Sequence, residues 1–219
     1  NNYETVTNID VEIEVGKATP SYETPTGLTA TYGDTLGDVT LPEGFTFQDD
    51  LTTSVGKAGT NKFKVTYTPT DTVNYKVVTD IDVEIEVGKA TYDMTGIEFV
   101  DKTVVYNGKY QSITITGELP EGVTVRYEHN SRQSVGTRLA TAIFIGDAEN
   151  YNAIPNKTAT ITITKATPSY EVPTGLTAEY GDTLADVTLP EGFAFQDALT
   201  TPVGALGDRT FKVKYTPAD

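Results

Sequence analysis

Few residues in this chain could carry catalytic chemistry. Its 219 residues include one histidine, no cysteine and no tryptophan. His129 lies in the segment Tyr-Glu-His-Asn-Ser, and with no second histidine and no cysteine a zinc site or a Ser-His-Asp triad lacks members. We therefore interpret His129 as a solvated turn residue. We expect no catalytic residues and predict that the protein is not an enzyme.

Carboxylates are the second group that could do chemistry. Asp49-Asp50 and the segment Asp147-Ala148-Glu149-Asn150 offer oxygen ligands for calcium, but neither has EF-hand or nonapeptide spacing. Asp10, Glu12 and Glu14 alternate along one face of an expected strand, whereas glycoside hydrolysis needs paired acids in a cleft. Turn capping and a solvated, charged sheet face explain these residues better. We expect no cofactor, with a calcium ion as the alternative.

The thirteen tyrosines could form platforms for sugar rings. Most of them, however, recur at fixed positions: beside turns (Tyr32, Tyr106, Tyr180), after asparagine (Tyr3, Tyr75, Tyr151) and in strands (Tyr67, Tyr215). Such recurrence favours packing roles, with the hydroxyl groups reaching the surface. Binding of glycan or mucin by the repeats is retained as the alternative function.

The composition excludes two classes of partner. The chain has 16 Lys and Arg against 31 Asp and Glu, a formal charge of −15, which repels nucleic acid and anionic lipid. No run approaches 18 consecutive apolar residues, so we expect no membrane insertion.

Internal repetition dominates the sequence. Residues 165–219 align without a gap on residues 17–71, with 42 of 55 positions identical at an offset of 148. Residues 73–90 recur at the start of the chain as residues 1–18, at an offset of 72. A divergent copy between them repeats the Leu-Pro-Glu-Gly, Val-Gly and Asn-Tyr signatures in the same order. Such periodicity indicates tandem modules.

We therefore divide the chain into four parts. They are an orphan final strand (residues 1–16), a complete repeat (17–88), a divergent complete repeat (89–164) and a repeat that lacks its final strand (165–219). These are called below the N-terminal segment, the first repeat, the middle repeat and the C-terminal repeat.

The periodicity within each repeat predicts strands. Residues 9–15 and their copy 81–87 alternate Ile or Val with acidic residues, which places four apolar side chains on one face. Alternation also predicts strands at 63–67, 140–146, 158–164 and 211–215, and Pro-Glu-Gly at 42–44, 120–122 and 190–192 predicts turns. About one helical turn is expected at 33–39 and at 181–187.

These elements predict an all-β protein. Each repeat fits a small, Ig-like β-sandwich or a β-grasp-like sheet, and the pattern does not choose between them. Val-Gly-Lys-Ala carries the last strand of one repeat into the next without a Gly/Ser-rich spacer. We therefore expect stiff connections and an elongated row of repeats.

The repeated residues resemble a known family. Tyr-Gly-Asp-Thr-Leu, Leu-Pro-Glu-Gly, Phe-Lys-Val-x-Tyr-Thr-Pro and Val-Glu-Ile-Glu-Val-Gly-Lys-Ala, together with Val-Val-Tyr-Asn-Gly in the middle repeat, resemble the MBG/YDG-type, Ig-like tandem repeats of large bacterial surface proteins. The resemblance implies stalk or spacer modules of an adhesin on the bacterial exterior. It transfers no catalytic and no binding residue.

The orphan strand predicts how copies associate. Burying Ile9, Val11, Ile13 and Val15 is worth roughly 6 to 12 kcal/mol gross, comparable with the net stability of a whole domain. We predict that this strand pairs with Phe211, Val213 and Tyr215 of a neighbouring copy, head to tail. The same packing is expected if residues 219 and 1 are adjacent in a longer, continuous array. Either arrangement predicts a stalk or fibre.

Overall fold

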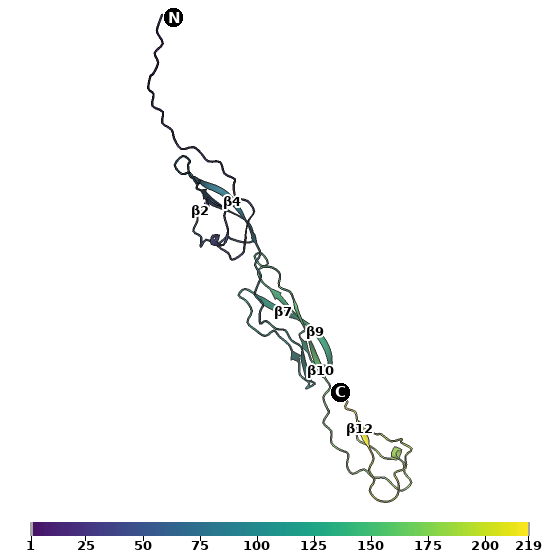
Figure 1. Cartoon of the computed structure of the whole chain (residues 1–219). Coiled ribbons are helices and arrows are strands. Elements are labelled where there is room, and N and C mark those ends of the chain that lie inside the picture. The colour runs from purple at the N-terminus through teal and green to yellow at the C-terminus, as the bar shows by residue number, and fades with distance from the viewer. Residues whose placement is uncertain (1, 219) are drawn as a thin grey trace.

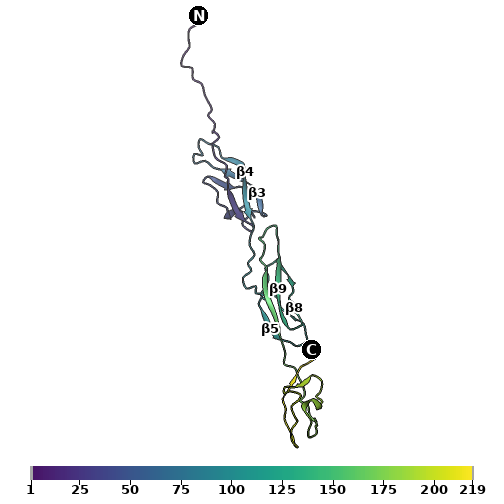
Figure 2. The same ribbon diagram turned by 90° about the vertical axis from the view of Figure 1, so that its right-hand side faces the viewer.

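A computed structural model describes residues 2–218. Its sheets follow one another along an elongated molecule, as two perpendicular views show (Figures 1 and 2). The described residues contain strands and two 3-10 helices of three residues each, and no helix among them is long and apolar enough to cross a membrane. The all-β prediction is confirmed, and the architecture is consistent with β-sandwich repeats.

The first repeat is built around one strand. β1 (Leu28–Thr31), β2 (Phe45–Phe47), β3 (Gly59–Tyr67) and β4 (Val78–Gly88) form a sheet in the order β1-β4-β3-β2. β4 pairs parallel with β1 and antiparallel with β3, so both of its edges are hydrogen-bonded. The 3-10 helix η1 (Leu36–Asp38) occupies the predicted helical turn.

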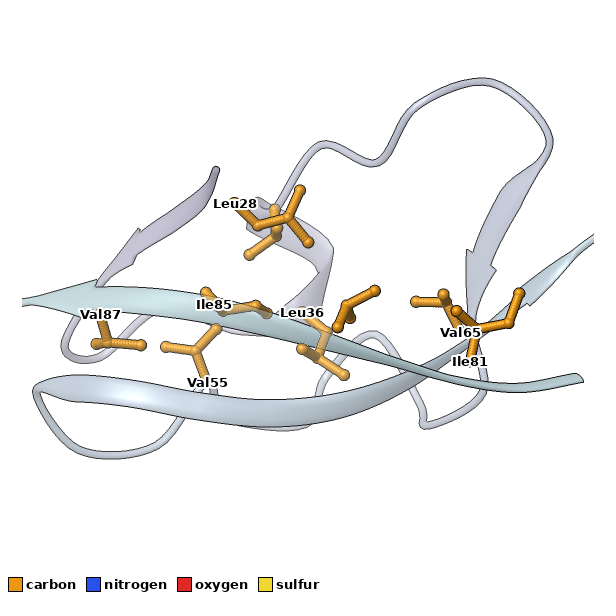
Figure 3. Close-up of a cluster of buried hydrophobic side chains, with 9 residues drawn as sticks. Leu28, Leu36, Val55, Val65, Ile81, Ile85 and Val87 are labelled. Carbon is orange, nitrogen blue, oxygen red and sulfur yellow. The ribbon is translucent and has the colours of Figure 1, made fainter. Parts of the chain in front are cut away.

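Strict alternation explains why β4 is central. From Ile81 onward its four apolar side chains point to one face and are buried, and its acidic side chains point to solvent. The buried side chains of β4 are Ile81, Val83, Ile85 and Val87. They belong to a cluster of nine buried residues, the others being Leu28, Leu36, Val39, Val55 and Val65 (Figure 3). Four of the nine core side chains therefore come from the last strand of the repeat.

The middle repeat follows the same plan. β5 (Lys102–Val105), β7 (Thr124–Glu128), β9 (Gly136–Ile145) and β10 (Lys157–Thr164) form a sheet in the order β5-β10-β9-β7, and β6 (Gln111–Ser112) pairs with β8 (Ser131–Arg132). The last strand, β10, is again central, parallel to β5 and antiparallel to β9. Its inward side chains Ala159, Ile161 and Ile163 are buried, as their spacing predicts.

The C-terminal repeat keeps only part of this plan. β11 (Phe193–Phe195) pairs with β12 (Val213–Tyr215) in the register that β2 and β3 adopt, and η2 (Leu184–Asp186) matches η1. Residues 176–179 and 207–212 match β1 and the start of β3 in sequence but form no strand. The predicted strand at 211–215 is accordingly shorter. Both segments lack the neighbour that β4 provides in the first repeat.

The predicted Pro-Glu-Gly turns are present. Gly44, Gly122 and Gly192 have φ of 84°, 76° and 85°, in the left-handed region that favours glycine. At Gly44 and Gly192 a Cβ atom would also come within 2.9 and 2.8 Å of the ring of Tyr67 and Tyr215, respectively. The two turns therefore require glycine for both backbone conformation and packing.

Candidate functional site

The N-terminal segment runs away from the first sheet as an extended chain (Figures 1 and 2). Ile9, Val11, Ile13 and Val15 are 70%, 75%, 79% and 89% exposed, whereas their counterparts in β4 are buried. We call residues 9–15 the ribbon. The sequence predicts a strand here, but no sheet edge within residues 2–218 pairs with it. A strand exists only where a partner supplies hydrogen bonds, so the difference lies in the partner and not in the alternating pattern.

One backbone feature is shared by the N-terminal segment and β4. Asn8 has φ of 63°, and its counterpart Asp80 has φ of 61°. Asp80 lies where the pairing of β3 with β4 shifts register, between Val65 and Tyr67. Asn and Asp are the non-glycine residues that best tolerate this conformation. Asn8 thus has the same left-handed φ as its counterpart at the register shift of β4.

A groove lies in the C-terminal repeat where β4 lies in the first repeat. Its volume is about 720 Å³, and two segments line it, 176–180 and 203–211, together with Leu184 and Val213. Leu176 is 42% exposed, whereas its counterpart Leu28 is 7% exposed. Val203 and Val213 are only half-buried, whereas Val55 and Val65 are buried. The groove is therefore lined by counterparts of residues that form the core of the first repeat.

The predicted contact residues divide into two groups. Phe211 and Val213 line the groove, while Tyr215 borders a second, smaller hollow of about 360 Å³ and packs against Phe193 and Tyr170. The four apolar residues of the ribbon lie at the other end of the chain (Figure 1). The contact between the two groups remains a prediction. The sequence analysis missed Leu176 and Val203, because the parallel pairing of β1 with β4 leaves no local sequence signal.

The other candidate residues have structural explanations. His129 is exposed in the turn after β7 and has φ of 57°. Asp50 Oδ1 accepts hydrogen bonds from the backbone N–H and the hydroxyl of Thr52, which lower the pKa of Asp50. No cluster of three or more potential metal-ligating side chains occurs within residues 2–218.

Asp147 organises the loop that was considered for calcium. The side-chain amide of Asn150 donates to Asp147 Oδ2 at 2.8 Å, and the backbone N–H of Glu149 donates to Oδ1 at 2.9 Å. These bonds hold the pKa of Asp147 below its ordinary value, the side-chain bond from Asn150 being the larger cause. Asp71 binds Asn74 in the same way, and its pKa is also lowered. Turn capping, as favoured above, accounts for the loop.

The acidic face of the ribbon has a paired counterpart in β4. Lys64 Nζ lies 2.9 Å from Asp82 Oδ1, and Lys62 Nζ lies 3.4 Å from Glu84 Oε1. The hydrogen bond from Lys64 lowers the pKa of Asp82. All four side chains are largely exposed, so each pair contributes little to stability.

Contacts between the first and middle repeats were not anticipated from the sequence. The backbone N–H of Ala58 donates to Asn150 Oδ1 at 3.1 Å, and Lys57 Nζ lies 3.1 Å from Glu149 Oε2. The ring of Tyr32 meets the ring of Tyr151 edge-on, with centroids 5.5 Å apart. The recurrence of the Tyr-Gly and Asn-Tyr pairs could have identified Tyr32, Asn150 and Tyr151, but not the other junction residues. We call this set of contacts the junction.

Comparisons with known proteins do not define a family. No family model and no curated protein matches this chain. One similar solved structure is of fibronectin(III)-like modules of CbhA from Clostridium thermocellum, at 14% identity and a TM-score of 0.25, covering 68% of this chain and 95% of that one. Another is of extracellular domains 3–5 of Drosophila OTK, at 12% identity and a TM-score of 0.19, covering 90% of this chain and 98% of that one. At these TM-scores neither supports a functional conclusion.

Proposed function

We propose that this chain is a structural repeat segment of an extracellular bacterial surface protein and forms a stiff stalk or fibre. The ribbon of one copy completes the C-terminal repeat of the next. The observation that carries the proposal is the groove between residues 176–180 and 203–211, at the place that β4 fills in the first repeat. The extracellular bacterial setting rests on the resemblance of the repeated motifs.

The pairing of β4 supplies the register. In the first repeat Ile85 lies opposite Leu28, and Val83 lies opposite Phe63. Applying the repeat offsets, Ile13 would lie opposite Leu176, and Val11 opposite Phe211. Ile9 and Val213 then take the places of Ile81 and Val65. This register is parallel to residues 176–179 and antiparallel to β12.

Apolar burial provides the driving force. Four Ile and Val side chains that are largely exposed would become buried, which is worth roughly 6 to 12 kcal/mol before ordering costs. Leu176, Val203 and Val213 would be covered by the same event. The gain is large enough to decide whether the C-terminal repeat is stable, since a domain has a net stability of about 5 to 15 kcal/mol.

On the solvent face of the added ribbon, the charged side chains would meet both favourable and unfavourable partners. Lys212 and Asp10 repeat the observed pair of Lys64 with Asp82. Asp208 would lie opposite Glu14, at a position where Thr60 donates a hydrogen bond to Glu86 at 2.8 Å. Like charges opposite each other oppose pairing by a small amount at an exposed site. The apolar face therefore determines the association.

The contact is heterologous, because different surfaces of the two copies meet. The N-terminal segment and the C-terminal repeat, whose residues line the groove, lie at opposite ends of the elongated molecule (Figure 1). The ribbon of one copy therefore cannot fill the groove of the same copy, and the association does not close. Heterologous contacts of this kind propagate into a fibre. In a continuous array the same contacts would form between successive 219-residue periods of one chain.

Assembly of the 219-residue chain tests the proposal. Sedimentation velocity should show concentration-dependent polymers for the unchanged chain and monomers for the double variant Val11→Asp/Ile13→Asp, since two buried carboxylates cannot be accommodated. Glu12→Gln, on the solvent face of the same ribbon, serves as the control and should assemble. A monomer at every concentration, or equal assembly by the double variant, contradicts the proposal.

Electrophoresis of the native material after full denaturation separates the two forms of the proposal. A band near 23.6 kDa indicates assembly of separate copies, whereas only very large species indicate a continuous chain.

A further inference from the structure

We propose that a second surface joins successive copies. It is formed by the loop 71–75 of one copy and, on the other, by the outer rim of the groove at Tyr180 and residues 205–207, which also line the groove. The inference rests on the proposed function, since it requires the ribbon in the groove. It is argued from the junction between the first and middle repeats, which shows how one repeat of this chain seats on the next.

The donor side of the junction is already folded in the first repeat. Asp71 accepts from the side-chain amide of Asn74 at 2.7 Å, as Asp147 accepts from Asn150 at 2.8 Å. The loops also share their anchors to the chain: Ala18 N–H donates to Asn74 O at 2.9 Å, and Ala90 N–H donates to Asn150 O at 3.0 Å. The two loops are therefore held by the same set of hydrogen bonds.

The two loops differ in what covers them. Asn150 is 4% exposed, because the first repeat packs over it and Ala58 donates to its Oδ1. Asn74 is exposed, and the neighbouring Val73 and Tyr75 are 77% and 40% exposed. The first repeat thus presents a formed but uncovered contact element.

The receiving side is equally uncovered. Tyr180 and Leu206, the counterparts of Tyr32 and Ala58, are 85% and 97% exposed. Leu206 is an alanine-to-leucine exchange and Ala205 a lysine-to-alanine exchange relative to the first repeat. Both exchanges make this tip of the C-terminal repeat more apolar.

The connecting segment fixes the distance between the two sides. Val87-Gly88-Lys89-Ala90 joins β4 to the middle repeat, and Val15-Gly16-Lys17-Ala18 joins the ribbon to the first repeat with the same sequence. A ribbon in the groove therefore brings the loop Asp71–Tyr75 to the position that Asp147–Tyr151 takes in the junction. A second copy of this chain is the occupant that this geometry selects.

The resulting contacts can be named. Leu206 N–H donates to Asn74 Oδ1, Tyr75 meets the ring of Tyr180, and Val73 lies against Ala205. The last pair takes the place of Glu149 and Lys57. The contact between copies is therefore apolar where the junction within the chain is ionic, which makes it less sensitive to salt.

Introducing the ionic pair of the junction at positions 73 and 205 tests this surface in the full chain. Val73→Glu and Ala205→Lys each remove the apolar pair, and we expect each to weaken polymerisation. The double variant restores the ionic pair of the junction, so we expect it to recover assembly at low salt and to lose it as salt rises. Tyr180→Ala should weaken association by about 3- to 10-fold. Val100→Glu, at an exposed valine of the middle repeat, is the matched control and should leave assembly unchanged.

Hydrogen exchange separates failure of this inference from failure of the proposed function. In the polymer we expect protection of the ribbon amides and of the Leu206 amide, with the Leu206 protection lost in Tyr180→Ala. A protected ribbon with a freely exchanging Leu206 amide, or with additive effects of Val73→Glu and Ala205→Lys, overturns the second surface and leaves the proposed function intact. An unprotected ribbon in the unchanged chain overturns both.

Discussion

Asn150 uses both ends of its side-chain amide. Its Oδ1 accepts from Ala58 in the first repeat, and its Nδ2 donates to Asp147 in its own loop. Lys57 and Glu149 pair beside it, but their side chains remain 68% and 61% exposed. A buried, fully satisfied amide and an exposed ion pair thus lie side by side at one junction.

Substitution of Asn150 and of Lys57 by alanine should have unequal effects on stability. Asn150→Ala leaves Ala58 N–H and Asp147 Oδ2 without their partner, so we expect the unfolding free energy of the middle repeat to fall by about 1 to 3 kcal/mol. Lys57→Ala removes only an exposed pair and should cost less than about 1 kcal/mol. Native-state hydrogen exchange of the β9 and β10 amides measures both. A larger effect of Lys57→Ala would refute this ranking.

At the scale of elements, the last strand of each complete repeat holds two neighbours together. β4 lies between β1 and β3, and β10 lies between β5 and β9. Residues 176–179 are identical to β1 at three of four positions but form no strand, because β1 pairs only with β4. The state of one segment therefore depends on another that is distant in sequence.

An isoleucine-to-alanine substitution at Ile85 in β4 and at its counterpart Ile13 in the ribbon distinguishes a paired strand from an unpaired one. Ile85→Ala creates a cavity in the first repeat, so we expect a loss of about 2 to 5 kcal/mol in its unfolding free energy. Ile13→Ala in the ribbon should leave the stability of every repeat in the monomer unchanged and should weaken only assembly. Urea unfolding at low protein concentration provides the comparison. Destabilisation of the monomer by Ile13→Ala would show that the ribbon packs on its own chain.

At the scale of the whole molecule, the two ends present different surfaces. One end carries the ribbon and the other carries the groove, and two further repeats lie between them (Figures 1 and 2). The short connections favour a stiff rod, and in the proposed assembly each added copy would extend the same axis.

This polarity predicts a chain terminator. The Val11→Asp/Ile13→Asp variant has no usable ribbon but retains the groove, so it can accept the ribbon of a growing fibre and then add nothing further. Small amounts mixed with the unchanged chain should shorten the fibres, and electron microscopy measures their length. If copies associated through identical surfaces instead, the variant would not change the fibre length at substoichiometric amounts.

Much of the fold could be predicted from local sequence. The alternation in residues 81–87 and 158–164 identified two buried strands, Pro-Glu-Gly identified turns, and Gly33–Val39 identified the site of η1. The parallel pairing of β1 with β4 was beyond such reasoning, because a short strand with one buried leucine has no distinctive pattern. The junction was also missed, since Lys57 and Glu149 look like ordinary surface residues in sequence.

The sequence by itself was enough to identify the repeats and most of their strands, and to show that the ribbon has the same residues as positions 81–87 of β4. These depend on period and on residue type, which act locally. Only the tertiary structure decided that β4 is the central strand and that its counterpart position in the C-terminal repeat is a groove. A strand gains hydrogen bonds and burial only from neighbours in space, and these neighbours are far apart in the chain.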